Sequence, residues 1–169
     1  MERPNNNEYA AYFETYVSLV PESDIVSAMR NQADELREIF SQISDDKGLY
    51  RYAEGKWTIK ELLGHLIDGE RVFAYRALRF ARADKTPLPG FDQDPYVENA
   101  NFNNVKLSDL LEEMLSLRNA NTLFFNNLSD EAWTRTGISS DHEISVRAIA
   151  FIIVGHIRHH VKVLKEKYL

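Results

Sequence analysis

The chain has 169 residues, which suits one domain and is short for two. Its 26 acidic side chains outnumber the 20 basic ones, so the formal net charge is −6 and a general nucleic-acid binder is not expected. The absence of cysteine excludes disulfide scaffolds, thiolate metal sites and cysteine nucleophiles. No signal peptide is apparent and no apolar run approaches the roughly 20 residues that span a bilayer. We therefore expect a single cytoplasmic domain over residues 1–169 with no membrane partner.

Apolar residues recur at helical spacing along most of the chain, and no segment alternates with period two for long. A short aromatic helix is predicted around Tyr9–Tyr16, followed by a long helix over residues 23–43. Residues 44–57 are interpreted as a linker. Thr58 and Glu61 match a capping box, which predicts a third helix ending near residue 82.

The second half of the chain contains the longest connection. Residues 84–106 show no clear periodicity and are predicted to form one long loop, a feature that is often functional in a small domain. Residues 108–127 are predicted as a helix whose N-cap is its first residue, Ser108, and residues 129–133 as a helical turn. Residues 137–143 are predicted as a second loop, after which Ser145 caps the last helix. Four long amphipathic helices with one long connection predict an all-α fold, a four-helix bundle.

Three of the five histidines lie close together in the last predicted helix. At about 100° per residue, His156 and His160 fall on one inward flank a single turn apart, whereas His159 points to solvent. This spacing allows two imidazoles to share one ion. His65 lies on the flank of another helix, and Gly69, one turn further, would leave space above its ring. The three histidines are candidate ligands for one divalent metal with an open coordination position; the alternative is that they are hydrogen-bonded packing residues.

Other residues near these histidines in the sequence also have candidate roles. Gly64 and Gly155 each directly precede a candidate ligand, which suggests close approach of helices at both positions. Glu70 lies about 140° around the helix from His65, so a salt bridge or cross-bundle contact is expected rather than a place at the metal. Arg76 lies near the face of His65 and could meet an anionic substrate or simply extend towards solvent.

One carboxylate in the long connection is a candidate for chemistry. Asp92 follows Phe91, and it would approach the metal if the connection folds over the end of the bundle. In that position it could act as a general base or hold a water molecule. The alternative is that the Pro-Gly and Asp-Pro pairs around it serve only to form turns.

Two widely separated segments of the chain resemble the DinB-like superfamily. Lys56–His65 (KWTIKELLGH) is similar to the second helix of that family, and Gly155–His160 (GHIRHH) is similar to its last helix. The resemblance covers nearly the whole chain and implies an up-down-down-up four-helix bundle, often found as a homodimer. It also implies a divalent metal ion held by His65, His156 and His160. Nickel and zinc have been associated with such sites, and iron or manganese are the other candidates.

The resemblance also bears on activity. Members of this superfamily include transferases that use a low-molecular-weight thiol, such as bacillithiol or mycothiol, and proteins assigned as metal-dependent hydrolases. It thus implies a metal-dependent S-transferase or hydrolase that acts on a small molecule. Because the chain has no cysteine, any thiol would have to be a cosubstrate. The alternative is a non-catalytic stress-related or interaction protein in which any metal is structural.

Overall fold

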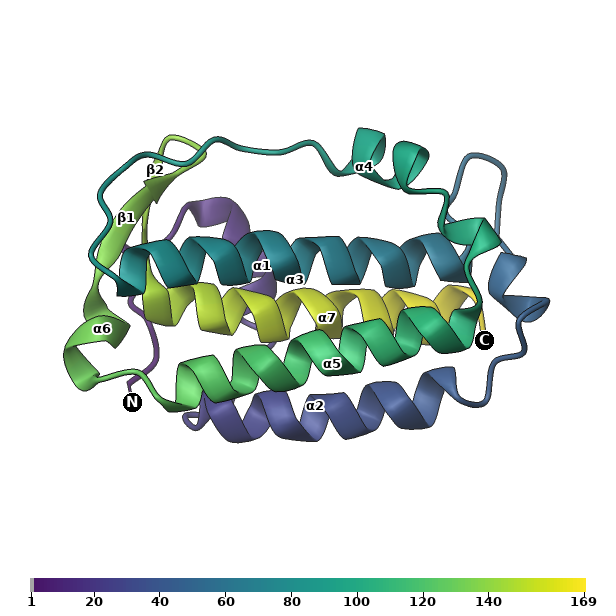
Figure 1. The fold of residues 1–169 in the computed structure, drawn as a ribbon, viewed down its shortest axis with the longest axis horizontal. Helices are drawn as coiled ribbons and strands as arrows, with labels where there is room; N and C mark the ends of the chain where they lie inside the picture. Colours follow the sequence, from purple (N-terminus) through teal and green to yellow (C-terminus); the bar gives the residue numbers. More distant parts are fainter. Residues whose placement is uncertain (1) are drawn as a thin grey trace.

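The computed structural model describes residues 2–169, in which four long helices form a bundle (Figure 1). α2 (Ile25–Phe40) and α7 (Val146–Lys167) run in one direction, and α3 (Ile59–Ala81) and α5 (Leu107–Asn126) run in the other. α3 packs between α5 and α7, and α2 packs against α5 and α7. The predicted up-down-down-up four-helix bundle is therefore confirmed. None of the helices within residues 2–169 is both long enough and apolar enough to cross a membrane.

Local caps explain where three of these helices begin. Asp24 accepts a hydrogen bond from the backbone N–H of Ser27 at the start of α2, and Ser145 caps α7 in the same way. Thr58 and Glu61 form both bonds of the predicted capping box at the start of α3. Each cap satisfies a backbone donor that the first helical turn leaves free.

The start of α5 differs from the prediction. The helix begins at Leu107, and Ser108 is therefore not its N-cap. The Asp45 carboxylate accepts a hydrogen bond from the backbone N–H of Leu107 at 2.7 Å instead. This cap comes from the segment between α2 and α3, so the sequence around α5 carries no sign of it.

Along the bundle axis, the buried interior changes from apolar to polar and back to apolar. Two apolar clusters fill the ends of the bundle, one around Phe80 and Phe151 and the other around Leu36 and Leu63. Between them lies a layer of buried polar side chains contributed by all four helices, namely Gln32, His65, Glu70, Arg118, Asn121 and His156. Since burying polar groups costs free energy unless they find partners, this layer is the part of the interior where function is expected.

The connection between α3 and α5 is not the continuous loop that was predicted. It contains α4 (Gln93–Ala100) and a 3-10 turn (Phe102–Asn104), and it runs the length of the bundle alongside α3 (Figure 1). The length follows from topology, because two parallel neighbouring helices require the chain to return to its starting end. The Phe102 ring packs on Gly64, where an added Cβ would lie 2.3 Å from the ring. Gly64 thus accommodates an aromatic ring and not the neighbouring helix that was expected.

The predicted loop over residues 137–143 is a β-hairpin. After the short helix α6 (Asp130–Thr134), β1 (Thr136–Ser139) pairs antiparallel with β2 (His142–Ser145). Ser140 and Asp141 form the two-residue turn with φ of 51° and 64°, the left-handed conformation that such tight hairpins need. The prediction failed here because neither turn residue is glycine or asparagine and each strand has only four residues.

The N-terminal helix is shorter than predicted. A 3-10 turn (Ala11–Phe13) leads into α1 (Glu14–Val17), and Tyr9 lies before both. α1 packs on α7 at Gly155, where an added Cβ would lie only 2.0 Å from the carbonyl oxygen of Tyr16. The close approach expected at Gly155 is therefore present, and its partner is the backbone of α1.

Candidate metal centre

Two antiparallel helices bring three imidazoles together. His65 comes from α3, and His156 and His160 come from successive turns of α7. The Nε2 atoms of His65 and His156 are 3.0 Å apart, and one candidate ligand nitrogen from each of the three rings lies within 4.8 Å of the others. The sequence pattern predicted this set, and the structure brings all three members to one place.

Burial keeps these imidazoles neutral. Desolvation lowers the pKa of His65 from its ordinary value of 6.5 to about 4. Burial also lowers the pKa of His160, with a further contribution from repulsion by His65 and His159, to about 3. The pKa of His156, the most deeply placed ring, is lowered well below its usual range by burial first and by the neighbouring histidines second. All three rings therefore present lone pairs at neutral pH, as metal ligands must.

The donor set fits one divalent ion. Nitrogens bound to zinc at 2.0–2.1 Å in a tetrahedral site lie about 3.3–3.4 Å from one another. The 3.0 Å separation of the His65 and His156 nitrogens and the 4.8 Å limit on the whole set bracket that value. No carboxylate belongs to this group among residues 2–169, so an ion held here would have three neutral protein ligands and a further position open.

Aromatic rings surround the three imidazoles. Tyr16 and Phe73 meet His156 edge-on, with ring centroids 5.3 and 5.9 Å away, and Trp57 lies 4.8 Å from His65. Gly69 faces the same centre, since an added Cβ would lie 3.0 Å from Cε1 of His156. Because Gly69 has no side chain, space is left above the ring of His156, whereas the sequence predicted this space above the ring of His65.

A pocket of about 480 Å³ opens onto this centre. His65 and His156 lie among its lining residues, and Tyr12, Phe13 and Tyr16 form an aromatic wall. The remaining lining residues come from the N-terminal segment, α3, the connection between α3 and α5, and the hairpin: Ala10, Gly69, Phe73, Arg76, Phe91, Asp92, Gln93, Ser140 and His142. The connection and the hairpin thus complete a pocket whose ligand-bearing side belongs to the bundle.

Asp92 lines this pocket, as the sequence argument required. The residue is exposed, and one of its carboxylate oxygens accepts a hydrogen bond from the backbone N–H of Asp94 at 3.1 Å. Asp92 is thereby the N-cap of α4. Its second oxygen makes no hydrogen bond within residues 2–169, which leaves the carboxylate able to act on a bound molecule.

Glu70 lies apart from the three histidines, as expected. Its carboxylate accepts bonds from Nε and Nη2 of Arg118, the shortest of them 2.6 Å, and from the side chain of Asn121. Arg118 and Glu70 are 0% and 1% exposed. This ion pair joins α3 to α5 and leaves Glu70 unable to serve as a ligand.

His159 is not the fully exposed residue that its position on the helical wheel suggested. It is half-buried, its ring lies 5.0 Å from that of His160 and 5.6 Å from that of Tyr16, and it does not belong to the ligand set. Together with His160 and Trp57 it lines a second hollow of about 370 Å³. The histidine cluster therefore borders a hollow on either side.

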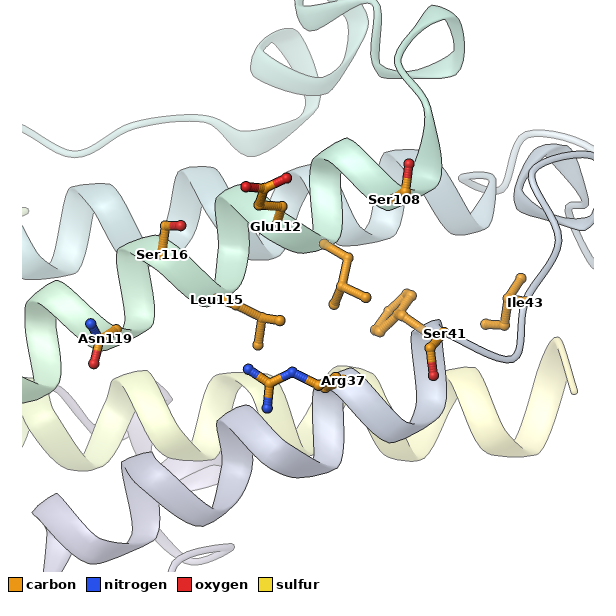
Figure 2. A pocket seen from close by; sticks show the side chains of 10 residues that line it. Arg37, Ser41, Ile43, Ser108, Glu112, Leu115, Ser116 and Asn119 are labelled. Atoms are coloured by element: carbon orange, nitrogen blue, oxygen red, sulfur yellow. The ribbon is translucent and has the colours of Figure 1, made fainter.

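Another hollow on the molecule is larger but offers no comparable chemistry. It measures about 680 Å³ and lies between α2 and α5, where Arg37 and Ser41 face the row of side chains from Ser108 to Asn119 (Figure 2). It contains no histidine, and Arg37 pairs with Asp34 at 2.8 Å. Volume alone therefore does not locate the functional site.

Several residues around the three histidines were not predicted from the sequence to lie there. Tyr16, Trp57 and Phe73 carry aromatic side chains of a kind that usually fills cores, and nothing in their spacing pointed to the histidines. Ser140 and His142 reach the pocket because the hairpin folds back against the connection, where the Leu88 N–H donates to Ile138 O at 2.9 Å. Only the tertiary structure brings these segments together.

Comparisons with known proteins agree with this geometry. The sequence model of the DinB superfamily matches residues 28–164, a range that contains all three histidines. A protein of Oceanobacillus iheyensis, whose name assigns it provisionally to the metal-dependent hydrolases, is 26% identical over 135 residues. That match covers 78% of this chain and 76% of the relative.

Two solved structures share the fold. YfiT from Bacillus subtilis is described as a probable metal-dependent hydrolase with an unusual four-helix bundle topology; its TM-score is 0.72 at 16% identity, over 98% of this chain and 91% of YfiT. A mycothiol-dependent maleylpyruvate isomerase has a TM-score of 0.68 at 12% identity, over 86% of this chain and 61% of the isomerase. The family match extends over most of the sequence and over the elements that form the histidine cluster. The chain belongs to the DinB superfamily.

Proposed function

We propose that the protein is a divalent-metal-dependent enzyme that converts a small molecule, either by hydrolysis or by transfer to a low-molecular-weight thiol. The observation that carries this proposal is the set of three neutral imidazoles facing one another beside a pocket of about 480 Å³. The hydrolase names of the O. iheyensis relative and of YfiT support the first reaction, and the mycothiol dependence of the isomerase supports the second.

His65, His156 and His160 would hold the ion. A divalent ion on three neutral imidazoles retains its full charge and an open position, and so lowers the pKa of a water or thiol placed there. Imidazole donors favour nickel or zinc, with iron and manganese as the other candidates. Because the chain has no cysteine, a thiol nucleophile would arrive as a cosubstrate.

The remaining pocket residues have supporting roles in this proposal. The rings of Tyr16 and Phe73 cover His156 and restrict water around it. Asp92 is the candidate general base: its carboxylate would take the proton from the attacking water or thiol and return it to the leaving group. Its place on the pocket wall supports this role.

The proposal also includes a homodimer that works in the cytoplasm without nucleic acid. The net charge of −6 supports the last point, since phosphate backbones attract clustered positive charge. Light scattering on the eluting protein measures the subunit number; a mass of 19.6 kDa, that of one chain, would contradict the dimer.

Metal content is the decisive measurement. Protein purified without a histidine tag should contain about one equivalent of a divalent metal by elemental mass spectrometry, and His65→Ala and His156→Ala should lose it. His159→Ala is the matched control, because it removes a neighbouring imidazole outside the ligand set. If both ligand variants keep the metal, or if the wild-type protein neither holds nor takes up any, the proposed function is wrong.

The role of Asp92 requires a turnover assay with the metal identified in this way. Asp92→Asn should lower kcat by about 10²- to 10⁴-fold for whichever hydrolysis or thiol transfer the loaded protein performs, with metal content unchanged. Asp94→Asn, two residues along the same segment, is the control and should leave kcat within a few fold. Equal rates for Asp92→Asn and the wild type would remove Asp92 from the mechanism.

A further inference from the structure

Arg76 is a buried cation without a carboxylate partner. The residue is 5% exposed, yet no Asp or Glu oxygen lies within 4.0 Å of its guanidinium among residues 2–169. Its hydrogen bonds both use Nη2, which donates to the carbonyl of Pro89 at 2.9 Å and to the hydroxyl of Ser140 at 3.4 Å. Nε and Nη1 therefore retain free donors, which lie on different edges of the guanidinium, and each can donate a hydrogen bond to a carboxylate oxygen.

These free donors are not sealed inside the protein. Within residues 2–169, Ser139 Oγ is the one fully enclosed side-chain polar atom that lacks a partner, so the Arg76 nitrogens reach open space. Arg76 borders another hollow of about 310 Å³ beside Pro89 and Tyr96, and it also lines the pocket of the histidine cluster together with His65 and His156. The unused hydrogen-bonding capacity of the guanidinium is thus available to a molecule bound there.

The geometry of α3 aligns Arg76 with the histidines. Arg76 follows His65 by eleven residues, which leaves the two side chains about 20° apart around the helix and their Cα atoms about 16 Å apart along it. Helical side chains lean towards the N-terminus, so the guanidinium extends back towards the histidine end. Gly69, between them, has no side chain to block the path. A small molecule could therefore reach both groups at once.

The surroundings favour a carboxylate over other anions. Phe73 and Phe91 place their rings 5.9 and 5.8 Å from the guanidinium carbon, and the aromatic wall of Tyr12 and Phe13 completes a mainly apolar pocket. Apart from Arg76, the lining contains no lysine or arginine, and it includes the carboxylate of Asp92. One arginine matches the single charge and planar oxygens of a carboxylate, whereas a phosphate dianion would require more donors. Burial also lowers the pKa of Arg76, which a bound anion would offset.

We propose that Arg76 is the anchor of a carboxylate subsite and that the substrate is a small carboxylic acid whose reacting group lies at the histidine cluster. This inference rests on the proposed function for the position of the reacting group, and it adds the chemical class of the substrate. Arg76 binds and orients the acid, the aromatic residues contact its apolar part, and Ser140 contributes a further donor beside the guanidinium.

Binding of a matched pair of probes tests this subsite without any turnover. The probes are 4-phenylbutyrate and its amide, which differ in charge but hardly in shape, titrated by NMR into zinc-loaded and chelated protein. The wild type should bind the acid about 10- to 100-fold more tightly than the amide in both forms, as expected for charge-assisted hydrogen bonds. In Arg76→Gln the preference should fall to about onefold, and in Arg76→Lys, which keeps the charge but loses the planar fork, it should be intermediate.

The control substitution is Arg82→Gln, which removes the same charge from an exposed position at the end of α3 and should leave the preference intact. Three results would overturn the subsite: equal binding of acid and amide by the wild type, a preference that Arg76→Gln leaves unchanged, or tighter binding of phenyl phosphate than of the acid. Circular dichroism verifies that the variants are folded. If Arg76→Gln does not fold, Arg76→Lys still tests the subsite.

The two proposals can fail separately. If the protein takes up no metal but still discriminates acid from amide through Arg76, the metal-dependent function is wrong and the carboxylate subsite stands. If the protein binds metal at the histidines but distinguishes the acid from the amide without Arg76, the subsite is wrong and the metal centre stands. The same holds if it distinguishes them only when the metal ion is bound.

Discussion

The polar layer in the middle of the bundle has two sides that differ in how burial is compensated. On the side shared by α3 and α5, Arg118 donates to both oxygens of Glu70 and to the side-chain oxygen of Gln32 at 2.6 Å. On the side shared by α3 and α7, the three clustered rings make one hydrogen-bond contact among residues 2–169, between His65 and His156. A buried polar group whose hydrogen bonds are completed within the chain therefore supports the fold, whereas one whose hydrogen bonds are incomplete marks a place for a ligand.

The largest expected loss of stability comes from removing Arg118 from its ion pair with Glu70. Arg118→Met leaves the Glu70 carboxylate buried without its cation, and such changes cost about 3–5 kcal/mol in the free energy of unfolding. The double variant Arg118→Met, Glu70→Gln removes the stranded charge and should recover a large part of that loss. Urea denaturation measures both. A loss below about 1 kcal/mol for the single variant would show that this ion pair is not the structural element described here.

A smaller effect is expected where α1 closes over the histidine side. Gly155→Ala places a methyl group against the backbone carbonyl of Tyr16, so α1 must shift, and we expect a loss of about 1–3 kcal/mol together with a changed environment for Tyr16. Gly64→Ala meets only the movable ring of Phe102 and gains helix propensity, so its loss should be smaller. Thermal melts compare the two variants; an equal or reversed order would contradict the distinction between backbone and side-chain contacts.

Acid should loosen the same N-terminal segment. Burial raises the pKa of Glu8, but hydrogen bonds from Arg147, the Asn5 backbone and Ser145 outweigh it and lower the pKa from 4.5 to about 2. Because the folded value lies below the unfolded one, the stabilisation is complete above about pH 4.5 and is lost as pH falls towards 2. After allowance for solvent screening we expect about 2 kcal/mol. The difference in unfolding free energy between wild type and Glu8→Gln should therefore shrink between pH 5 and pH 2.5; a constant difference would contradict this origin.

The smallest effect on stability is expected at Arg76, whose guanidinium has unused hydrogen-bond donors. Arg76→Gln removes a buried cation that has no carboxylate partner within the described residues 2–169, so the lost hydrogen bond to Pro89 is offset by relief of desolvation. The free energy of unfolding should change by less than about 1 kcal/mol, although the preference for the carboxylate probe over its amide is lost. A loss of 3 kcal/mol, as for Arg118, would place Arg76 with the residues that support the fold.

Much of the bundle could be predicted from the sequence because the information is local. Apolar periodicity located the long helices to within a few residues, and the capping box at Thr58 fixed the start of α3. The spacing of His156 and His160 put both on one flank of α7 because helix geometry alone determines it. Their meeting with His65 depends in addition on how α3 and α7 pack, which the geometry of a single helix does not determine.

The features that could not be predicted depend on contacts between distant segments. The hairpin turns at Ser140 and Asp141 without a glycine, and Asp45 caps a helix 62 residues further along the chain. Similarly, the sequence does not distinguish an aromatic residue such as Trp57 from an ordinary core residue. Its contact with an imidazole depends on the tertiary structure. The catalytic role of Asp92 remains a prediction, because its carboxylate also has a structural role as the N-cap of α4.

The connection between α3 and α5 has a consequence for how this protein can change over evolution. It exists because two parallel helices require a return path, and it runs alongside the bundle, against which it packs Leu88, Val97 and Phe102 (Figure 1). It nevertheless contributes Phe91, Asp92 and Gln93 to the pocket, while the histidines belong to the bundle. Substitutions at the exposed positions Asp92 and Gln93 can alter which molecules are accepted at little cost in folding free energy. Substrate preference can therefore diversify on a fixed metal-binding framework.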